Sequence, residues 1–285
     1  MLFTQTSCAV LLALFCSVLW ALGNVYVQRA SVALGGLRAM FWSQLVGTAV
    51  LIPLALWLED RPVAPLASDL AITAVGSALG YYGMVVAFSE GALSGVVPLV
   101  TAWAVPAAIV GVLWSGEAPG LGQGVGGVMI LVGAVGNGVL APKVHGEGSR
   151  RALLWAAAGA LGFGVMVAGT ARMRDQLGAI GVIPSVWIAQ WVLLAPLFTR
   201  RDLRGLPARG QWPAVLGMAF FESFGFVAYT LATRMAPVAV VSPPASVSSL
   251  LTVLYANVVL REPLTPARWG LVLLAAAGTL LVAAG

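Results

Sequence analysis

The chain has 285 residues, of which 60% are hydrophobic and only 9% are charged. Soluble domains have roughly 45–50% apolar and about 25% charged residues. So few charged residues cannot cover a core of this size with a polar shell, so the composition predicts that the solvent is a lipid bilayer. The formal net charge of +5 comes mostly from arginines in short loops. No run of Lys or Arg is long enough to follow a phosphate backbone, which argues against nucleic-acid binding.

Ten apolar stretches follow one another, each close to the roughly 20 residues that a helix needs to cross a bilayer. The first lacks the basic segment of a secretory signal, so we interpret it as the first span. The longest polar interruptions, 142–151 and 200–211, are too short for a soluble domain, which places the function within the membrane. The predicted spans are 8–28, 37–58, 69–89, 94–115, 120–141, 151–171, 180–199, 212–233, 238–260 and 266–284.

The two halves of the chain repeat each other. A shift of 145 residues aligns identical residues without gaps: Gly80 with Gly225, Ala87 with Ala232, Val96 with Val241, Pro98 with Pro243, Glu117 with Glu262 and Gly133 with Gly278. A copy of five spans crosses the membrane an odd number of times, so consecutive copies have opposite orientations. We predict an all-α integral membrane protein with ten transmembrane helices, in which two inverted five-helix repeats, residues 1–142 and 143–285, surround a central cavity.

The segment Leu260-Arg261-Glu262-Pro263-Leu264-Thr265, followed by Trp269-Gly270 and a helix of small residues, resembles the second repeat of the EamA-type drug/metabolite transporter (DMT) superfamily. Ser115-Gly116-Glu117-Ala118-Pro119 is similar to the same signature in the first repeat. The resemblance covers essentially the whole chain. It implies a basket-shaped carrier of ten helices with a central cavity, which exports small metabolites across a bacterial inner membrane.

Within that superfamily, the size and layout are similar to those of the YddG-type exporters of aromatic and other neutral amino acids. Trp20 in the first span and Trp103 in the fourth, before Pro106, are similar to aromatic positions of that group. Gly162-Phe163-Gly164 stands where its sixth helix carries a tryptophan. This departure argues against carrying over the specificity for aromatic substrates.

Glu222, in the middle of the eighth span, is the one acidic residue that we place near the bilayer midplane. An ionised carboxylate at that depth costs about 2.5–3.5 kcal/mol, so we expect it to face a hydrated cavity or a partner. One interpretation is a proton-coupling group or a counter-ion for a substrate ammonium. The other is a protonated glutamate that hydrogen-bonds between helices.

Further polar and aromatic residues lie away from the span ends, where Trp and Tyr normally concentrate. A cavity surrounded by helices with one or two polar groups apiece suits a small zwitterion. Each such residue can equally serve core packing or interhelical hydrogen bonding. The candidate substrate-binding residues are Trp20, Asn24, Gln44, Tyr81, Tyr82, Trp103, Trp187, Gln190, Glu222 and Ser246.

Prolines interrupt the fourth and ninth spans, where they remove backbone donors and kink the helices. The repeat places one proline of each span at an equivalent depth, so half-helices could bend alternately and open each side. Static kinks that shape the carrier are the alternative. The candidate gating residues are Pro98, Pro106, Pro243, Pro244, Gly80 and Gly225.

Glu117 and Glu262 follow equivalent helices, and we expect each to accept hydrogen bonds from backbone donors at the start of the next helix. Cys8 and Cys16 share the first span, which predicts neither a disulfide framework nor a metal site. An intramembrane enzyme would need a nucleophile with a base, or a metal cluster. The single histidine, His145, lies in a loop and Gly-x-Ser-x-Gly is absent. We therefore expect no enzyme, no metal and no cofactor.

These observations predict a secondary transporter that exports small metabolites, foremost neutral or aromatic amino acids, by alternating access. Efflux of lipophilic cationic drugs is the alternative. The expected partners are a small-molecule substrate, protons if Glu222 couples transport to them, and the lipid bilayer. The spacing of Gly122 and Gly126 allows close helix contact within a monomer or in a weak homodimer.

The orientation in the membrane stays open. Most lysines and arginines lie in the loops after the first, fifth, seventh and ninth predicted spans. By the positive-inside rule, this asymmetry predicts that both termini lie outside the cytoplasm. The family resemblance implies the reverse.

Overall fold

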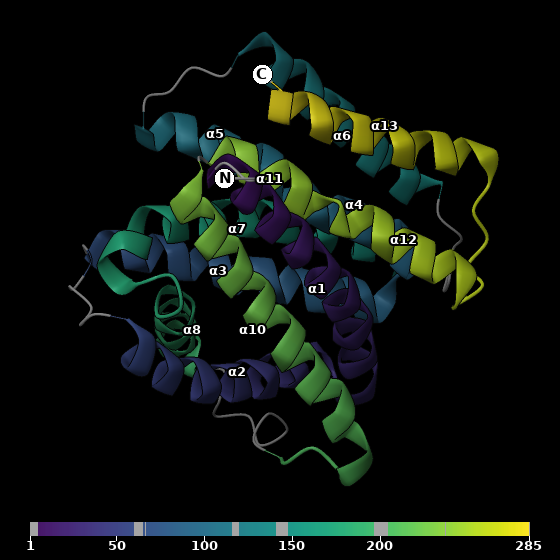
Figure 1. Ribbon diagram of the computed structural model, residues 1–285. Coiled ribbons are helices and arrows are strands. Elements are labelled where there is room, and N and C mark those ends of the chain that lie inside the picture. Colours follow the sequence, from purple (N-terminus) through teal and green to yellow (C-terminus); the bar gives the residue numbers. More distant parts are fainter. Residues whose placement is uncertain are drawn as a thin grey trace.

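The structure is a computed structural model, which describes residues 5–59, 65, 67–115, 120–140, 148–196, 205–236 and 238–284. Within these ranges every element is a helix (Figure 1). The first half contains α1 (Gln5–Leu34), α2 (Gly36–Leu58), α3 (Ala67–Glu90), α4 (Leu93–Val100), η1 (Thr101–Trp103), α5 (Ala104–Ser115) and α6 (Leu121–Val139). The second half contains α7 (Gly148–Leu177), α8 (Val182–Leu193), η3 (Arg209–Gln211), α10 (Trp212–Met235), α11 (Val238–Ser246), α12 (Ser248–Val258) and α13 (Pro266–Ala284).

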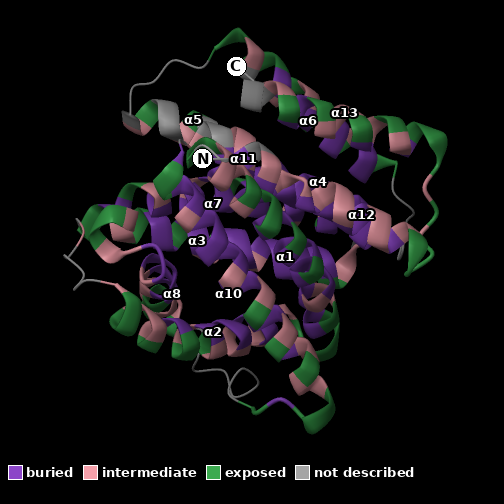
Figure 2. Cartoon of the chain, in the orientation of Figure 1, coloured by how far each residue is buried: buried purple, intermediate pink, exposed green. Residues whose placement is uncertain are grey.

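The prediction of a helical membrane protein is confirmed. Among the described residues, α1, α2, α3, α7 and α10 are long and apolar enough to cross a membrane, and shorter apolar helices form the other spans. Large apolar side chains such as Phe15 and Leu56 are exposed on the outside of the bundle, where they would face lipid (Figure 2). The helices α1 and α7 are longer than predicted, whereas α8 ends at Leu193, before the predicted end at residue 199.

The fourth and ninth spans are both broken in the middle. In the fourth, the 3-10 turn η1 separates α4 from α5, and Pro98 precedes the break. In the ninth, Val247 separates α11 from α12, and Pro243 and Pro244 precede it. Each proline lacks the N–H that would continue the helix hydrogen bonds. Under the 145-residue shift, η1 falls on residues 246–248, so the two breaks occupy equivalent positions.

Helices from opposite halves pack in pairs: α1 along α10, α3 along α7, and α6 along α13, the last pair at the edge of the molecule (Figure 1). Shifting the bounds of α3 and α6 by 145 residues gives the bounds of α10 and α13. The same shift maps α1 onto α7 within a few residues. The α1–α10 pair is therefore equivalent to the α3–α7 pair. In the third pair, α6 and α13 are equivalent to each other. A two-fold relation between inverted halves produces this pattern.

The crossing of α6 and α13 shows this relation at the level of single residues. A Cβ atom added to Gly133 would lie 2.5 Å from the carbonyl oxygen of Leu271, and one added to Gly278 would lie 2.6 Å from that of Gly126. Leu271 and Gly126 are themselves equivalent under the shift. Both glycines are required because the two backbones approach each other this closely.

Glu262 caps a helix of the other half. Its carboxylate accepts hydrogen bonds from the backbone N–H groups of Leu93 and Ser94, at the start of α4, over 3.1 and 2.9 Å. The prediction that Glu262 bonds to the start of the next helix is wrong, because α13 begins with Pro266, which has no N–H, whereas the first N–H groups of α4 lack helical partners. Glu117, for which we predicted the same role, lies outside the described residues.

A second glutamate, in the first half, makes the same kind of contact with a helix of the second half. Glu59, at the end of α2 in the first half, accepts hydrogen bonds from the N–H groups of Ile180 and Gly181, both over 3.0 Å. These two residues lead into α8 of the second half. The two caps therefore tie the halves to each other through helix N-termini, where a negative charge is favourable.

Arg268 is buried beside the Glu262 cap, with 1% of its surface exposed. Its guanidinium donates hydrogen bonds to Asn137 Oδ1 over 3.1 Å, to Ser94 Oγ over 2.9 Å and to the carbonyl oxygen of Pro263 over 2.7 Å. Three apolar helices, α4, α6 and α13, are thereby joined at one end of the molecule by a polar network.

Candidate functional site

A pocket lies between the two halves, near the middle of the helices that form it. It is walled by α1, α3, α7, α10 and α12 and by the break between α4 and α5. The space inside it that the centre of a water-sized sphere can occupy is about 40 Å³. Since about 10–15 Å³ by this measure holds one water, this is a narrow conformation that must widen to admit a metabolite. The lining residues are Trp20, Asn24, Met84, Val100, Thr101, Trp103, Phe163, Val167, Glu222, Phe226 and Ser248.

Glu222 brings an acidic group into this pocket from α10. The residue is 6% exposed, and it forms no hydrogen bond or ion pair with any residue that the structure describes. A Cβ atom added to Gly23 would lie 2.7 Å from Glu222 Oε1, so the carboxylate rests against the bare backbone of α1. An acidic group in this position favours a cation or a proton, because nothing around it in the described structure neutralises a negative charge.

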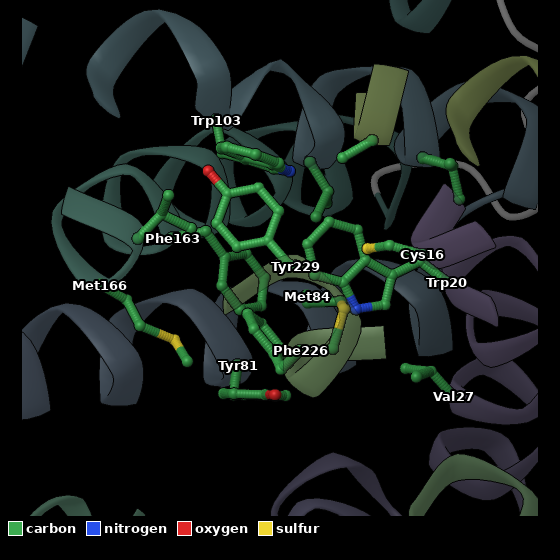
Figure 3. Close-up of a cluster of buried hydrophobic side chains, with 14 of the residues drawn as sticks. Cys16, Trp20, Val27, Tyr81, Met84, Trp103, Phe163, Met166, Phe226 and Tyr229 are labelled. Carbon is green, nitrogen blue, oxygen red and sulfur yellow. The ribbon is translucent and has the colours of Figure 1, made fainter. Parts of the chain in front are cut away.

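Aromatic rings form one wall of the pocket. Figure 3 shows several of them, among them Trp20, Trp103 and Phe226, in the buried cluster. The ring of Trp20 stacks on Tyr229 with 5.6 Å between centroids, and meets Phe226 and Trp103 edge-on at 5.0 and 6.0 Å. The indole of Trp20 lies over Gly225, where an added Cβ atom would be 2.6 Å from Nε1. This Nε1 has no hydrogen-bond partner among the described residues, so the aromatic wall offers a free donor.

Polar side chains from α1, α12 and the first break complete the pocket. Asn24 Nδ2 donates a hydrogen bond to Thr252 Oγ1 over 3.1 Å, which links α1 to α12. The Ser248 hydroxyl, at the start of α12, is buried and has no partner within the described structure. Thr101, in η1, donates to the carbonyl oxygen of Val97 over 2.8 Å. The pocket therefore combines one acid, neutral polar groups and aromatic rings.

Four of the predicted substrate-binding residues, Trp20, Asn24, Trp103 and Glu222, line this pocket. Four others lie beside the pocket, between α2, α3 and α8: Gln44, Tyr81, Trp187 and Gln190. There Ser77 Oγ donates to Gln190 Oε1 over 2.5 Å, and Gln190 Nε2 donates to Gln44 Oε1 over 2.8 Å. The ring centroids of Tyr81 and Trp187 are 6.0 Å apart in the same cluster.

The other two predicted substrate-binding residues lie elsewhere. Tyr82 packs edge-on against Trp155 of α7, with 4.9 Å between ring centroids. Ser246 donates a hydrogen bond to the carbonyl oxygen of Ser242 over 2.9 Å and faces a second cavity. The structure brings neither residue to the pocket of Glu222.

The second cavity separates the two broken spans from the α6–α13 pair. Thr101 is the residue that lines both cavities, so the break in the fourth span forms the partition between them. The hydroxyl groups of Thr101, Ser246 and Thr279 in this cavity bond to carbonyl groups of their own helices. The other lining residues are Pro98, Ala102, Ile130, Val247, Ser249, Leu250, Val272, Ala275 and Ala276.

The predicted gating prolines lie at or near the two breaks. Pro98 lines the second cavity, and Pro106, after the break, packs on α7, where an added Cβ atom on Gly164 would be 2.7 Å from Pro106 Cβ. Pro244 is partly buried in α11, and the side chain of Pro243 lies outside the described structure.

The two predicted gating glycines allow close approaches in equivalent helices. Gly80 in α3 faces Phe163 of α7, since an added Cβ atom would lie 2.9 Å from the Phe163 backbone nitrogen. Gly225 in α10 makes room for the indole of Trp20 in α1. Both glycines therefore set how closely a pair of helices can pack beside the pocket.

Seven lining residues are not among the predicted substrate-binding residues, namely Met84, Val100, Thr101, Phe163, Val167, Phe226 and Ser248. Apolar residues on a membrane helix have the same pattern whether they face lipid, a neighbouring helix or a cavity. The repeat did contain a usable signal. Under the shift, Phe226 is equivalent to Tyr81 and Ser248 to Trp103, both of which we had selected.

Comparison with known proteins places these observations in a family. The model of the EamA-like transporter family matches residues 7–139 and, separately, residues 150–284, one match in each half. No curated protein sequence matches the chain. A solved structure described only as the crystal structure of a protein is similar over 96% of this chain and 97% of its own, with a TM-score of 0.73 and 16% sequence identity.

The structural similarity establishes the fold, and the family model establishes the family. Both matches of that model fall on the helices that surround the pocket, and each covers one repeat. The chain therefore belongs to the EamA-like transporter family, within the drug/metabolite transporter superfamily, and is a multi-pass membrane transporter of small solutes.

Proposed function

We propose that this transporter exports neutral or aromatic amino acids across a bacterial inner membrane by alternating access between its two inverted repeats. The observation that carries the proposal is the buried carboxylate of Glu222, which has no partner among the described residues and lies in an aromatic pocket shared by both halves. A carrier of this kind needs one site at mid-depth that both halves can expose in turn.

The role of Glu222 follows from its surroundings. A carboxylate that is 6% exposed and has no partner among the described residues needs either a proton or a bound cation to offset its lost hydration. An amino-acid ammonium supplies the cation. When the substrate leaves, a proton takes its place, and this exchange couples transport to the proton gradient.

The rest of the pocket suits the uncharged part of such a substrate. The rings of Trp20, Trp103, Phe163 and Phe226 provide apolar and aromatic contact, and Asn24 and Ser248 provide hydrogen-bonding groups. The mixture fits a small molecule with one cationic group, polar atoms and an apolar side chain.

The equivalent breaks in the fourth and ninth spans supply the motion. Each break leaves backbone groups without regular helix partners, so the half-helices on either side can tilt at low cost. Because the breaks adjoin the pocket, a tilt in one half widens its entrance on one side while the other half keeps the opposite side closed.

The pocket is complete within one chain, which supports a monomer as the working unit. Gly126, considered above as a dimer contact, already packs against Gly278 of the same chain. A weak homodimer is thus not needed to build the site.

The test is counterflow of labelled amino acids in proteoliposomes, with and without an imposed pH gradient. Glu222→Gln keeps the shape of the side chain and removes the charge, and we expect it to abolish gradient-driven transport. Glu90→Gln is the matched control, because Glu90 makes a surface ion pair with Arg151 over 3.5 Å. Undiminished gradient-driven flux in Glu222→Gln would reject the proposed role.

Efflux of lipophilic cations is the second candidate, and the aromatic rings around Glu222 favour it because they can also bind a cation through their faces. The same vesicles distinguish the two functions. Export of a quaternary ammonium dye without exchange of any amino acid would select drug efflux.

A further inference from the structure

A group of four buried polar side chains lies beside the pocket. The atoms Gln44 Nε2, Tyr81 Oη, Trp187 Nε1 and Ser223 Oγ have no hydrogen-bond partner among the residues that the structure describes. The four residues are 2%, 0%, 1% and 1% exposed. Buried polar atoms usually have partners, because each one without a partner loses its hydration and gains nothing in return. Four such atoms on neighbouring helices suit a ligand that reaches all of them.

These side chains come from four neighbouring helices, α2, α3, α8 and α10. A Cβ atom added to Gly47, one turn after Gln44 in α2, would meet both Ser223 Oγ of α10 and, at 2.8 Å, the ring of Trp187 of α8. The Trp187 indole nitrogen and the Tyr81 hydroxyl of α3 lie close to each other, although they do not complete a hydrogen bond. We call Gln44, Tyr81, Trp187 and Ser223 the donor cluster.

Each free atom of the donor cluster can donate a hydrogen bond. An indole N–H and an amide NH₂ only donate, and the two hydroxyl groups can do so. Two hydrogen bonds connect the neighbouring side chains in a row: Ser77 Oγ donates to Gln190 Oε1, and Gln190 Nε2 donates to Gln44 Oε1. This chain occupies the acceptor oxygen of Gln44 and leaves its NH₂ group free. A site in which every free group can donate a hydrogen bond suits an anion.

The donor cluster adjoins the acidic side of the pocket. Ser223 follows Glu222 in α10, and Glu222 is close enough to Tyr81 to act on it electrostatically. The ring of Phe226, which lines the pocket, is 6.3 Å from that of Tyr81. An anionic group bound at the donor cluster would therefore lie near a cationic group bound at Glu222.

We infer that the donor cluster binds the carboxylate of a zwitterionic substrate while Glu222 holds its ammonium group. The inference rests on the proposed function, because it needs a substrate that carries both charges. In the narrow conformation described above, the four donors are desolvated and unpaired. A carboxylate bound between them would satisfy all four, and so would stabilise a conformation in which α2 and α8 separate slightly from α3 and α10.

Three L-amino acids are each compared with the amine that lacks the carboxylate. The comparison tests the carboxylate subsite separately from the rest of the pocket. The pairs are L-leucine with 3-methylbutylamine, L-phenylalanine with 2-phenylethylamine, and L-threonine with 1-amino-2-propanol. Counterflow of each labelled amino acid is measured in proteoliposomes with increasing concentrations of either member of its pair. The best-exchanged pair is then used with the variants.

We expect Tyr81→Phe to weaken competition by the amino acid by roughly tenfold, the effect of losing one hydrogen bond to a charged group, and to leave competition by the amine unchanged. Gln44→Glu, which replaces a donor by an anion, should abolish amino-acid competition, whereas Gln44→Leu should only weaken it. Tyr82→Phe is the control, because Tyr82 packs on Trp155 away from the cluster. Melting of each purified variant in detergent identifies any that fail to fold.

The outcomes separate the two proposals. Equal weakening of the amino acid and its amine in Tyr81→Phe, or full amino-acid competition in Gln44→Glu, would overturn the carboxylate subsite and leave amino-acid transport standing. Exchange of amines in the wild-type protein without competition by any of the three amino acids would overturn both proposals.

Discussion

The missing side chain at Gly23 gives the Glu222 carboxylate its position. A methyl group there would come within 2.7 Å of Oε1, which is a flexible end of a side chain that can move away. We therefore expect Gly23→Ala to fold normally and to bind substrate several-fold more weakly in counterflow, because the carboxylate is displaced. Gly124→Ala is the control, since an added Cβ atom meets nothing within 4 Å there. Wild-type affinity in Gly23→Ala would show that the carboxylate position does not matter.

Single residues could be selected from the sequence where a polar or indole side chain lies deep in a membrane span, which is unusual. Glu222 and Asn24 were identifiable because charged and amide groups in a membrane span are costly, and Trp20 and Trp103 because indoles away from the interface are uncommon. Gln44 and Gln190 have the same signature, but they pair with each other beside the pocket. Which polar groups pair with each other depends on how helices rotate against their neighbours, and a single sequence does not specify that rotation.

At the crossing of α3 and α7, the backbones of the two halves lie very close together. This contact allows a prediction about stability. A Cβ atom added to Gly162 would overlap the backbone nitrogen of Gly80 and come within 2.6 Å of the Gly76 carbonyl oxygen. Because backbone cannot move aside as a side chain can, Gly162→Ala must separate the two helices.

We expect Gly162→Ala to lower the free energy of unfolding in detergent by about 1–3 kcal/mol, the usual range for overpacking. Gly270→Ala, at a helix position with open space around it, should not lower stability, because alanine is more favourable than glycine inside a helix. The measurement is thermal or denaturant unfolding followed by tryptophan fluorescence. Equal stability of the two variants would mean that this crossing is looser than described.

Glu59 and Glu262 cap helices of opposite halves. Their removal provides a second prediction about the helices. Glu59→Ala and Glu262→Ala should each destabilise the protein by about 1 kcal/mol, as for loss of a helix cap. Because the two caps share no partners, the double variant should lose the sum of the two effects. Unfolding of the two single variants and the double variant measures this, and strong non-additivity would contradict independent caps.

The helices themselves were predictable because hydropathy and length alone identify a span. The breaks in the fourth and ninth spans were also foreseeable from Pro98 and Pro243, since a proline removes a helix donor wherever it lies. The partner of Glu262 was not foreseeable. Its carboxylate bonds to a helix that is distant in the sequence, and only the packing of the two halves brings them together.

Taken as a whole, the molecule has two halves with matching backbones and different ends. Arg268, Ser94 and Asn137 form a buried network at one end. Their equivalents under the repeat are Gln123, Ala239 and Val282, so the sequence does not repeat this set of residues. The Arg268 network therefore adds hydrogen bonds between helices at this end of the molecule.

A single cysteine at Ser248 tests most directly whether the two halves enclose one pocket that opens to each side. Ser248 lines the pocket and its hydroxyl has no partner in the described structure, so Ser248→Cys is a small change. In a background with Cys8 and Cys16 replaced by alanine, we predict that a membrane-impermeant maleimide labels this cysteine from either side of the membrane, and that substrate protects it. Gly210→Cys, in the exposed 3-10 helix η3, should be labelled from one side only. Labelling of Ser248→Cys from one side under every condition would contradict a shared pocket with alternating access.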